Sequence, residues 1–115
     1  MTTISIANHL WFEETELGAT LNYRSDETPG GILFRVGISH DSLARCNAAM
    51  VGPYCIWTIG DGSLMIAGDS EQLTLTFSTA GSKLYQGGIS LYGEELAAFK
   101  TAINAFACRR QTALN

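Results

Sequence analysis

Hydrophobic residues recur along the chain with two different spacings, and the spacing changes at Gly93. Beyond Gly93, apolar side chains recur at steps of three and four, which places four of them on one helical face: Leu96, Phe99, Ile103 and Phe106. Glu94 and Glu95 fall in the first turn, while Arg109 and Arg110 fall in the last, as the helix dipole favours. The pattern predicts one long helix that begins at Gly93 and covers a sheet with its apolar face.

The chain before Gly93 mostly alternates hydrophobic and polar residues, which is typical of half-buried β-strands. Strands are expected over Thr3 to Phe12, Ala19 to Arg24, Ile32 to Ser39, Tyr54 to Ile59, Ser63 to Ala67, Gln72 to Ser78 and Leu84 to Leu91. The stretch from Leu43 to Met50 predicts a short helix, because Ser39 or Asp41 can cap it and Gly52-Pro53 would stop it.

These elements predict an α+β fold with a curved antiparallel sheet of about seven strands, a short central helix and a long C-terminal helix packed on one face. The tripeptide Gly-Ile-Ser precedes both predicted helices, and TLNYRS (20–25) takes the place in the first half that TLTFST (74–79) takes in the second. The repetition indicates an internal ββββα-type duplication within a single domain, 1–115, with halves of about 1–52 and 53–115. The same sheet and helices are expected without a duplication.

Composition and charge narrow the classes of function. The chain has 115 residues, of which 46% are hydrophobic and 16% charged, and its formal net charge is −4. This charge opposes broad attraction to nucleic acid or anionic lipid. No run approaches the roughly 20 apolar residues of a membrane helix, and the N-terminal stretch lacks the features of a signal peptide. Cys46, Cys55 and Cys108 have no CxxC spacing, so we expect reduced thiols in a cytoplasmic protein.

The chain contains residue types that act in catalysis and metal binding, but they lack the spacing of catalytic or metal-binding motifs. His9 and His40 form no zinc-type motif with the cysteines, and the glycine-rich turns lack the pattern of a phosphate loop. The glutamates cluster where solubility and the helix dipole explain them. We therefore expect no catalytic residues, no metal site and no cofactor. An enzyme remains an alternative, which would require a cleft that brings His9 or His40 to a cysteine or carboxylate.

The order of elements carries one resemblance to known proteins. The last predicted strand runs through Gly88 to Leu91 into a helix that begins with Glu94 and Glu95 and continues with Leu96 and Phe99, and a fainter copy lies at Gly37 to Leu43. In this order the chain resembles the ββββα unit of the transcriptional positive-cofactor, Whirly and Pur-type proteins. The resemblance implies that fold, with single-stranded nucleic acid bound on the sheet.

Nucleic-acid binding on a sheet needs basic and aromatic side chains interleaved on its surface. Outside the helix ends, the only basic residues on or beside the predicted strands are Arg24, Arg35 and Lys83. The leading hypothesis is therefore a non-catalytic protein-binding module, such as an inhibitor, an immunity-type protein or an accessory protein, that occludes a partner's surface with its open sheet face. Single-stranded nucleic-acid binding is the alternative.

The partner of such a module is expected to be another protein, and an acidic chain favours a basic one. Homodimerisation is a further option, because the predicted edge strands carry few protecting prolines or inward charges. The residues predicted for partner binding are aromatic and basic residues on or beside the strands: Trp57, Tyr85, Tyr23, Arg24 and Arg35. Six further polar positions would form one sheet surface if their strands were neighbours: Thr20, Asn22, Arg24, Gln72, Thr74 and Thr76.

Overall fold

The computed structural model describes residues 2–25, 31–59, 63–78 and 86–114. In chain order the elements are β1 (Thr3–Ala7), β2 (Leu10–Thr15), β3 (Gly18–Ser25), β4 (Ile32–Ser39), α1 (His40–Ala49), β5 (Tyr54–Thr58), β6 (Leu64–Asp69), β7 (Gln72–Ser78), β8 (Gln86–Tyr92) and α2 (Gly93–Leu114). Within the described residues, a run of four strands followed by a helix therefore occurs twice.

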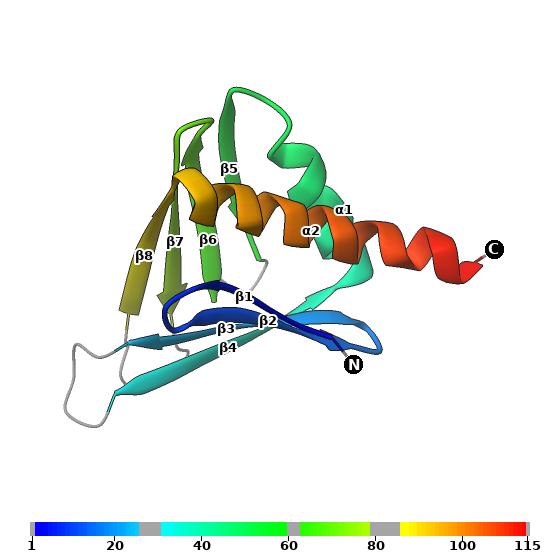
Figure 1. Ribbon diagram of the computed structural model, residues 1–115, viewed down its shortest axis with the longest axis horizontal. Coiled ribbons are helices and arrows are strands. Elements are labelled where there is room, and N and C mark those ends of the chain that lie inside the picture. The colour runs from blue at the N-terminus through cyan, green and yellow to red at the C-terminus, as the bar shows by residue number, and fades with distance from the viewer. Residues whose placement is uncertain (1, 26–30, 60–62, 79–85, 115) are drawn as a thin grey trace.

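The strands form two antiparallel sheets rather than one (Figure 1). The first sheet has the order β1-β2-β3-β4 and the second has the order β5-β6-β7-β8. The predicted α+β class and the antiparallel pairing are confirmed, whereas the prediction of one curved sheet of about seven strands is wrong. Two features explain the difference. The stretch from Thr3 to Phe12 forms two strands, because the chain reverses at His9, where φ is 66°, and α1 separates β4 from β5.

The two helices lie between the sheets and cover the inner face of each (Figure 1). Helix α1 contacts β3, β4 and β5, while α2 contacts β1, β3, β7 and β8, and the helices also pack against each other. Each helix therefore touches both sheets, so the two halves share one hydrophobic core. Within the part of the chain that the structure describes, this packing leaves the outer face of each sheet uncovered by a helix.

The ends of the helices follow local chemistry. Ser39 caps α1 with its hydroxyl oxygen, which accepts a hydrogen bond from the backbone N–H of Ser42 at 3.2 Å. Helix α1 thus begins at His40, earlier than the expected start at Leu43. Helix α2 begins at Gly93, as predicted, but it continues to Leu114. Its four predicted stripe residues are all buried, which confirms the apolar face: Leu96, Phe99, Ile103 and Phe106.

Aromatic rings join the layers at two places in the core. The ring of Phe12 in the first sheet lies 5.6 Å from that of Phe99 and 5.5 Å from that of Phe106, both on α2. At the other end, Phe77 of the second sheet lies 5.1 Å from Tyr23 and 5.7 Å from Phe34 of the first sheet. Such ring pairs add to the stabilisation that burial provides. The first cluster fixes α2 on the first sheet, and the second fixes the two sheets to each other.

Cys46 and Cys55 lie in the core, and Cys108 is exposed near the end of α2. Burial raises the pKa of Cys46 from its usual value of 9.0 to about 12, and the neighbouring Cys55 adds to this shift. Burial also raises the pKa of Cys55. A thiol that resists ionisation is a poor nucleophile and a poor metal ligand, since both roles use the thiolate. These two cysteines therefore act as small hydrophobic residues.

The raised pKa of Cys46 makes the stability of the fold decrease in alkali. The folded protein keeps this thiol protonated up to a pH of about 12, whereas the unfolded chain releases the proton near the usual pKa of 9.0. The free energy of unfolding should therefore fall above pH 9, by about 1.4 kcal/mol per pH unit from this residue. Urea unfolding followed by circular dichroism at pH 8, 9 and 10 measures the slope.

Cys46→Ala is the informative variant for this prediction. It should be less stable at every pH, because it leaves a small cavity, but its stability should fall less steeply above pH 9 than that of the wild type. Cys108→Ala changes an exposed position and should retain the wild-type slope. Equal slopes for Cys46→Ala and the wild type would contradict the prediction.

Candidate functional site

The outer face of the second sheet carries a strip of exposed apolar side chains on β5 and β6. Tyr54 is 65% exposed, Ile56 62% and Met65 43%. The strand register places Ile56 opposite Ala67 and Met65 opposite Thr58, so the apolar residues are contiguous. We call Tyr54, Ile56, Met65 and Ala67 the β5–β6 strip. A contiguous exposed apolar patch on one face is typical of a contact surface for another molecule.

The rest of this face is polar but nearly uncharged. The hydroxyl groups of Thr74 and Ser90 lie 3.1 Å apart across β7 and β8, and Tyr92 is exposed at the end of β8. Asp69 is the only acidic or basic residue in strands β5 to β8. Its carboxylate accepts hydrogen bonds from the backbone N–H groups of Glu71 at 2.9 Å and Gln72 at 3.0 Å, and these hydrogen bonds lower the pKa of Asp69. Asp69 thus holds the β6–β7 turn.

The outer face of the first sheet carries a polar group of four side chains, which we call the Glu13 cluster: Trp11, Glu13, Asn22 and Arg35. The Glu13 carboxylate accepts the indole N–H of Trp11 at 2.9 Å and the side-chain amide of Asn22 at 3.3 Å. It also lies 3.9 Å from the guanidinium of Arg35. Three strands, β2, β3 and β4, contribute to the cluster.

Asn22 is the unusual member of the Glu13 cluster. Although it points to the outer face, its exposed fraction is 0%. Its amide nitrogen faces three acceptors, the Glu13 carboxylate and the backbone oxygens of Trp11 and Thr20. Its side-chain oxygen, Oδ1, is also buried and has no hydrogen-bond partner among the described residues. A buried acceptor without a donor is unfavourable, so this atom marks the cluster as a position where a donor would be stabilised.

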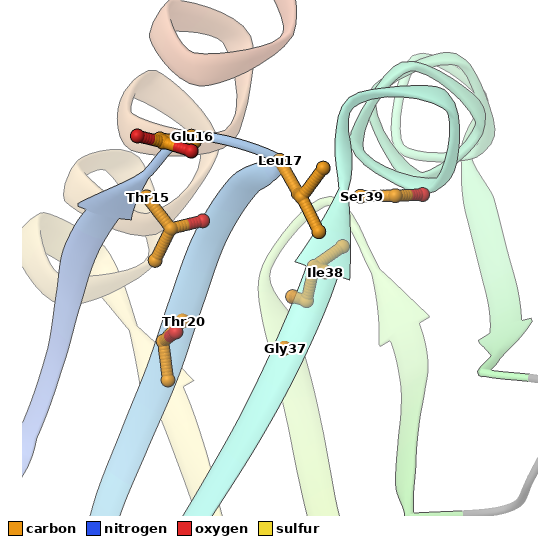
Figure 2. A pocket seen from close by; sticks show the side chains of 7 residues that line it. All are labelled: Thr15, Glu16, Leu17, Thr20, Gly37, Ile38 and Ser39. Atoms are coloured by element: carbon orange, nitrogen blue, oxygen red, sulfur yellow. The ribbon is translucent and has the colours of Figure 1, made fainter.

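A hollow of about 600 Å³ lies on the outer face of the first sheet (Figure 2). It is lined by Thr15, Glu16, Leu17, Thr20, Gly37, Ile38 and Ser39. The strand register places Glu13 opposite Thr20, one of the residues that line the hollow. Figure 2 shows the Leu17 side chain reaching from the β2–β3 turn towards β4, near Ile38 and Ser39, with the bare backbone of Gly37 further along the strand. A Cβ atom at Gly37 would meet nothing within 4 Å, so the missing side chain helps to form the space. We call it the Gly37 hollow.

The structure brings two of the residues predicted for partner binding together and separates the others. Arg24 and Arg35 lie on the outer face of the first sheet, on neighbouring strands. Tyr23 lies on the inner face, where it contacts Phe77 and donates its hydroxyl hydrogen to the backbone oxygen of Gly88 at 3.2 Å. Trp57 is half-buried against the core. Tyr85 and Lys83 lie outside the described residues.

The residues predicted for partner binding include none of the β5–β6 strip, although the sequence carries a signal for it. Cys55 reads as a buried thiol, and Trp57 shares its parity along the strand, so Trp57 must point inward and Ile56 outward. The single polar surface expected from Thr20, Asn22, Arg24, Gln72, Thr74 and Thr76 is divided in the structure. The first three lie on β3 and the last three on β7, which belong to different sheets.

In residues 2–25, 31–59, 63–78 and 86–114, no group of three or more His, Cys, Asp or Glu side chains could hold a metal ion. Over the same residues, no helix combines the length and the apolar character needed to cross a membrane.

Comparison with known proteins gives no relative for this chain. No protein-family model, no curated protein and no solved structure matches it.

Proposed function

We propose that this protein is a non-catalytic binding module that recognises another protein with the outer face of its second sheet. The observation that carries the proposal is the β5–β6 strip, in which Tyr54, Ile56 and Met65 are all exposed on one face. In this role the protein acts as an inhibitor, an immunity-type protein or an accessory protein, by covering a surface that its partner uses. Tyrosine, isoleucine and methionine supply contact area with little charge to desolvate.

The charges on this face define the chemistry of the partner. Asp69 is the only acidic or basic residue in the four strands, and backbone donors already occupy its carboxylate. A charged group placed against the β5–β6 strip would lose water without gaining a counter-charge. The centre of the partner's surface should therefore be apolar. The net charge of −4 on the whole chain favours basic residues at the periphery of that surface, because opposite charges accelerate association.

The cellular setting that fits this proposal is the cytoplasm. The buried positions of Cys46 and Cys55 and the absence of a disulfide among the three cysteines suit a compartment in which thiols stay reduced. A binding module of this kind needs no cofactor, and its own fold supplies the recognition surface.

The proposal is tested by capture followed by direct binding. Tagged wild-type protein is incubated with lysate of its own source, with and without nuclease, and captured proteins are identified by mass spectrometry. The captured protein is then purified, and its affinity is measured by calorimetry against the wild type and against Ile56→Glu. Because Ile56 is 62% exposed, this substitution should leave the stability nearly unchanged. It should weaken binding by more than about tenfold, since it buries a carboxylate in an apolar contact.

Leu33→Glu is the matched control for the capture experiment. Leu33 is 40% exposed, but it lies on the outer face of the first sheet, so its substitution should leave the partner bound. If Ile56→Glu and Leu33→Glu retain or lose the partner equally, the second sheet is not the docking face. If the wild-type protein captures nucleic acid, and its protein partners are lost on nuclease treatment, the proposal of a protein-binding function is wrong.

Single-stranded nucleic-acid binding is the second candidate, and one observation favours it. Arg24 and Arg35 share the outer face of the first sheet with Trp11, which joins basic and aromatic groups on one surface. Against this, Arg35 lies beside the Glu13 carboxylate, and the chain carries a net charge of −4. The nuclease treatment described above separates the two candidates.

A further inference from the structure

We propose that the Glu13 cluster and the Gly37 hollow together form a binding site for an arginine side chain of a partner protein. The site lies on the outer face of the first sheet, whereas the proposed docking face belongs to the second. The inference therefore stands on different residues, and its test does not depend on the β5–β6 strip. Three features support it: a guanidinium already rests there, a buried acceptor has no donor, and a hollow lies on the same face.

The first feature is the chain's own Arg35, which shows that a guanidinium fits over Glu13. The register places Arg35 opposite Asn22, and Glu13 opposite Thr20. Arg35 is on β4 and Glu13 on β2, so their backbones lie about 10 Å apart. To approach the Glu13 carboxylate to 3.9 Å, the Arg35 side chain must reach across β3, the strand that carries Asn22. The burial of the outward-pointing Asn22 fits this arrangement.

Arg35 fills this position imperfectly. Its separation of 3.9 Å from Glu13 exceeds hydrogen-bond length, and it donates no hydrogen bond to Asn22 Oδ1. The Arg35 side chain is 58% exposed and that of Glu13 is 40% exposed, and exposed ion pairs contribute little to stability. A second guanidinium can therefore displace Arg35 with little loss.

The orientation of Asn22 explains why an incoming group must be a donor. Its amide nitrogen is directed by acceptors on β2 and β3, namely the Glu13 carboxylate and the oxygens of Trp11 and Thr20. This arrangement fixes which end of the amide is the oxygen, since a flipped amide would place an acceptor against three acceptors. Oδ1 consequently points away from β2. A guanidinium has several N–H donors in one plane, so it can serve Oδ1 and the Glu13 carboxylate at the same time.

The hollow provides space for the aliphatic part of the ligand. Glu13, Thr20 and Gly37 form one row across β2, β3 and β4, so only Thr20 separates the space above Gly37 from Glu13 in this row. The exposed side chain of Leu17 borders this space (Figure 2). Methylene groups of an arginine side chain can pack there while its charged end reaches Glu13. Lysine would reach the carboxylate too, but it lacks the planar set of donors.

The site is tested by NMR titration with short peptides as probes. Uniformly ¹⁵N-labelled protein is titrated with the blocked tripeptide Gly-Arg-Gly, and in parallel with the same peptide carrying citrulline, the neutral counterpart of arginine. The reporters are the indole N–H of Trp11, which is bonded to Glu13, and the side-chain amide of Asn22. Trp57→Phe assigns the indole signal, because the chain has two tryptophans. Saturable shifts of both reporters are expected with arginine, and none with citrulline.

Three variants, each with a control, define the contacts. Glu13→Gln should abolish the shift of the Asn22 amide, whereas Glu14→Gln removes the same charge from the opposite face of β2 and should have little effect. Arg35→Ala removes the competing guanidinium and should tighten binding several-fold, whereas Arg24→Ala should not. Gly37→Val fills the hollow and should weaken binding by about tenfold, and an unchanged melting temperature shows that the fold is intact.

Several outcomes would overturn the inference. Equal shifts with the citrulline peptide would show that the positive charge is not recognised. Shifts that do not saturate, or that are absent from both reporters, would show that arginine does not occupy the site. Equal affinity in Arg35→Ala and the wild type would show that Arg35 does not compete for it. None of these results bears on the capture experiment with Ile56→Glu, so failure of this site and failure of the proposed function are distinguishable.

Discussion

Replacing Phe12 with alanine should lower the free energy of unfolding by about 3–5 kcal/mol, the range found when a buried phenylalanine is truncated. Phe12 is completely buried, and its ring lies 5.6 Å from that of Phe99 and 5.5 Å from that of Phe106. The substitution leaves a cavity between the first sheet and α2, and it removes both ring contacts. Urea unfolding at neutral pH, followed by circular dichroism, measures the loss.

Two comparisons make this measurement specific to the core. Phe12→Leu retains most of the apolar volume and should lose much less stability than the alanine variant. Tyr54→Ala removes an aromatic ring that is 65% exposed, so its effect should stay within about 0.5 kcal/mol. A loss below about 1 kcal/mol for Phe12→Ala would mean that α2 is not held on the first sheet by this cluster.

Gly18→Ala is expected to cost more than about 2 kcal/mol, because the backbone at the start of β3 leaves no room for a side chain. Gly18 has a φ of 157°, and a Cβ atom there would lie 2.1 Å from the backbone oxygen of Ile38. That oxygen belongs to the paired strand β4, so the overlap can be relieved only if the β3–β4 pairing shifts. The effect is measured by the same urea unfolding.

Gly37→Ala is the matched control for this prediction, since Gly37 lies on the neighbouring strand. A Cβ atom at Gly37 would meet nothing within 4 Å, and its φ is not in the left-handed region. Alanine should therefore be neutral there, or should stabilise the fold by about 0.4–1 kcal/mol by restricting the unfolded chain. Similar losses of stability in the two variants would show that steric overlap with β4 is not the reason that alanine destabilises the fold at position 18.

The candidate site shows how far reasoning from sequence extends. Strand alternation assigns each residue to one of two faces, and it places Arg35 and Val36 on opposite faces of the sheet. It does not reveal that Arg35, Asn22 and Glu13 lie next to one another, because that proximity depends on the register of three strands. The burial of the Asn22 side-chain oxygen likewise depends on how the side chains of neighbouring strands pack around it.

Local patterns in the sequence determined most of the elements, although Thr3 to Phe12 forms two strands instead of one and α1 begins at His40 rather than Leu43. The stripe from Leu96 to Phe106 specified α2, and the alternation in Gln72–Ser78 specified β7. These features depend on residues a few positions apart, so the sequence carries them directly. Only the tertiary structure decided that the strands form two sheets, and which faces remain uncovered. Pairing between distant strands, and the burial of one face of each sheet under two shared helices, depend on long-range packing that local periodicity does not encode.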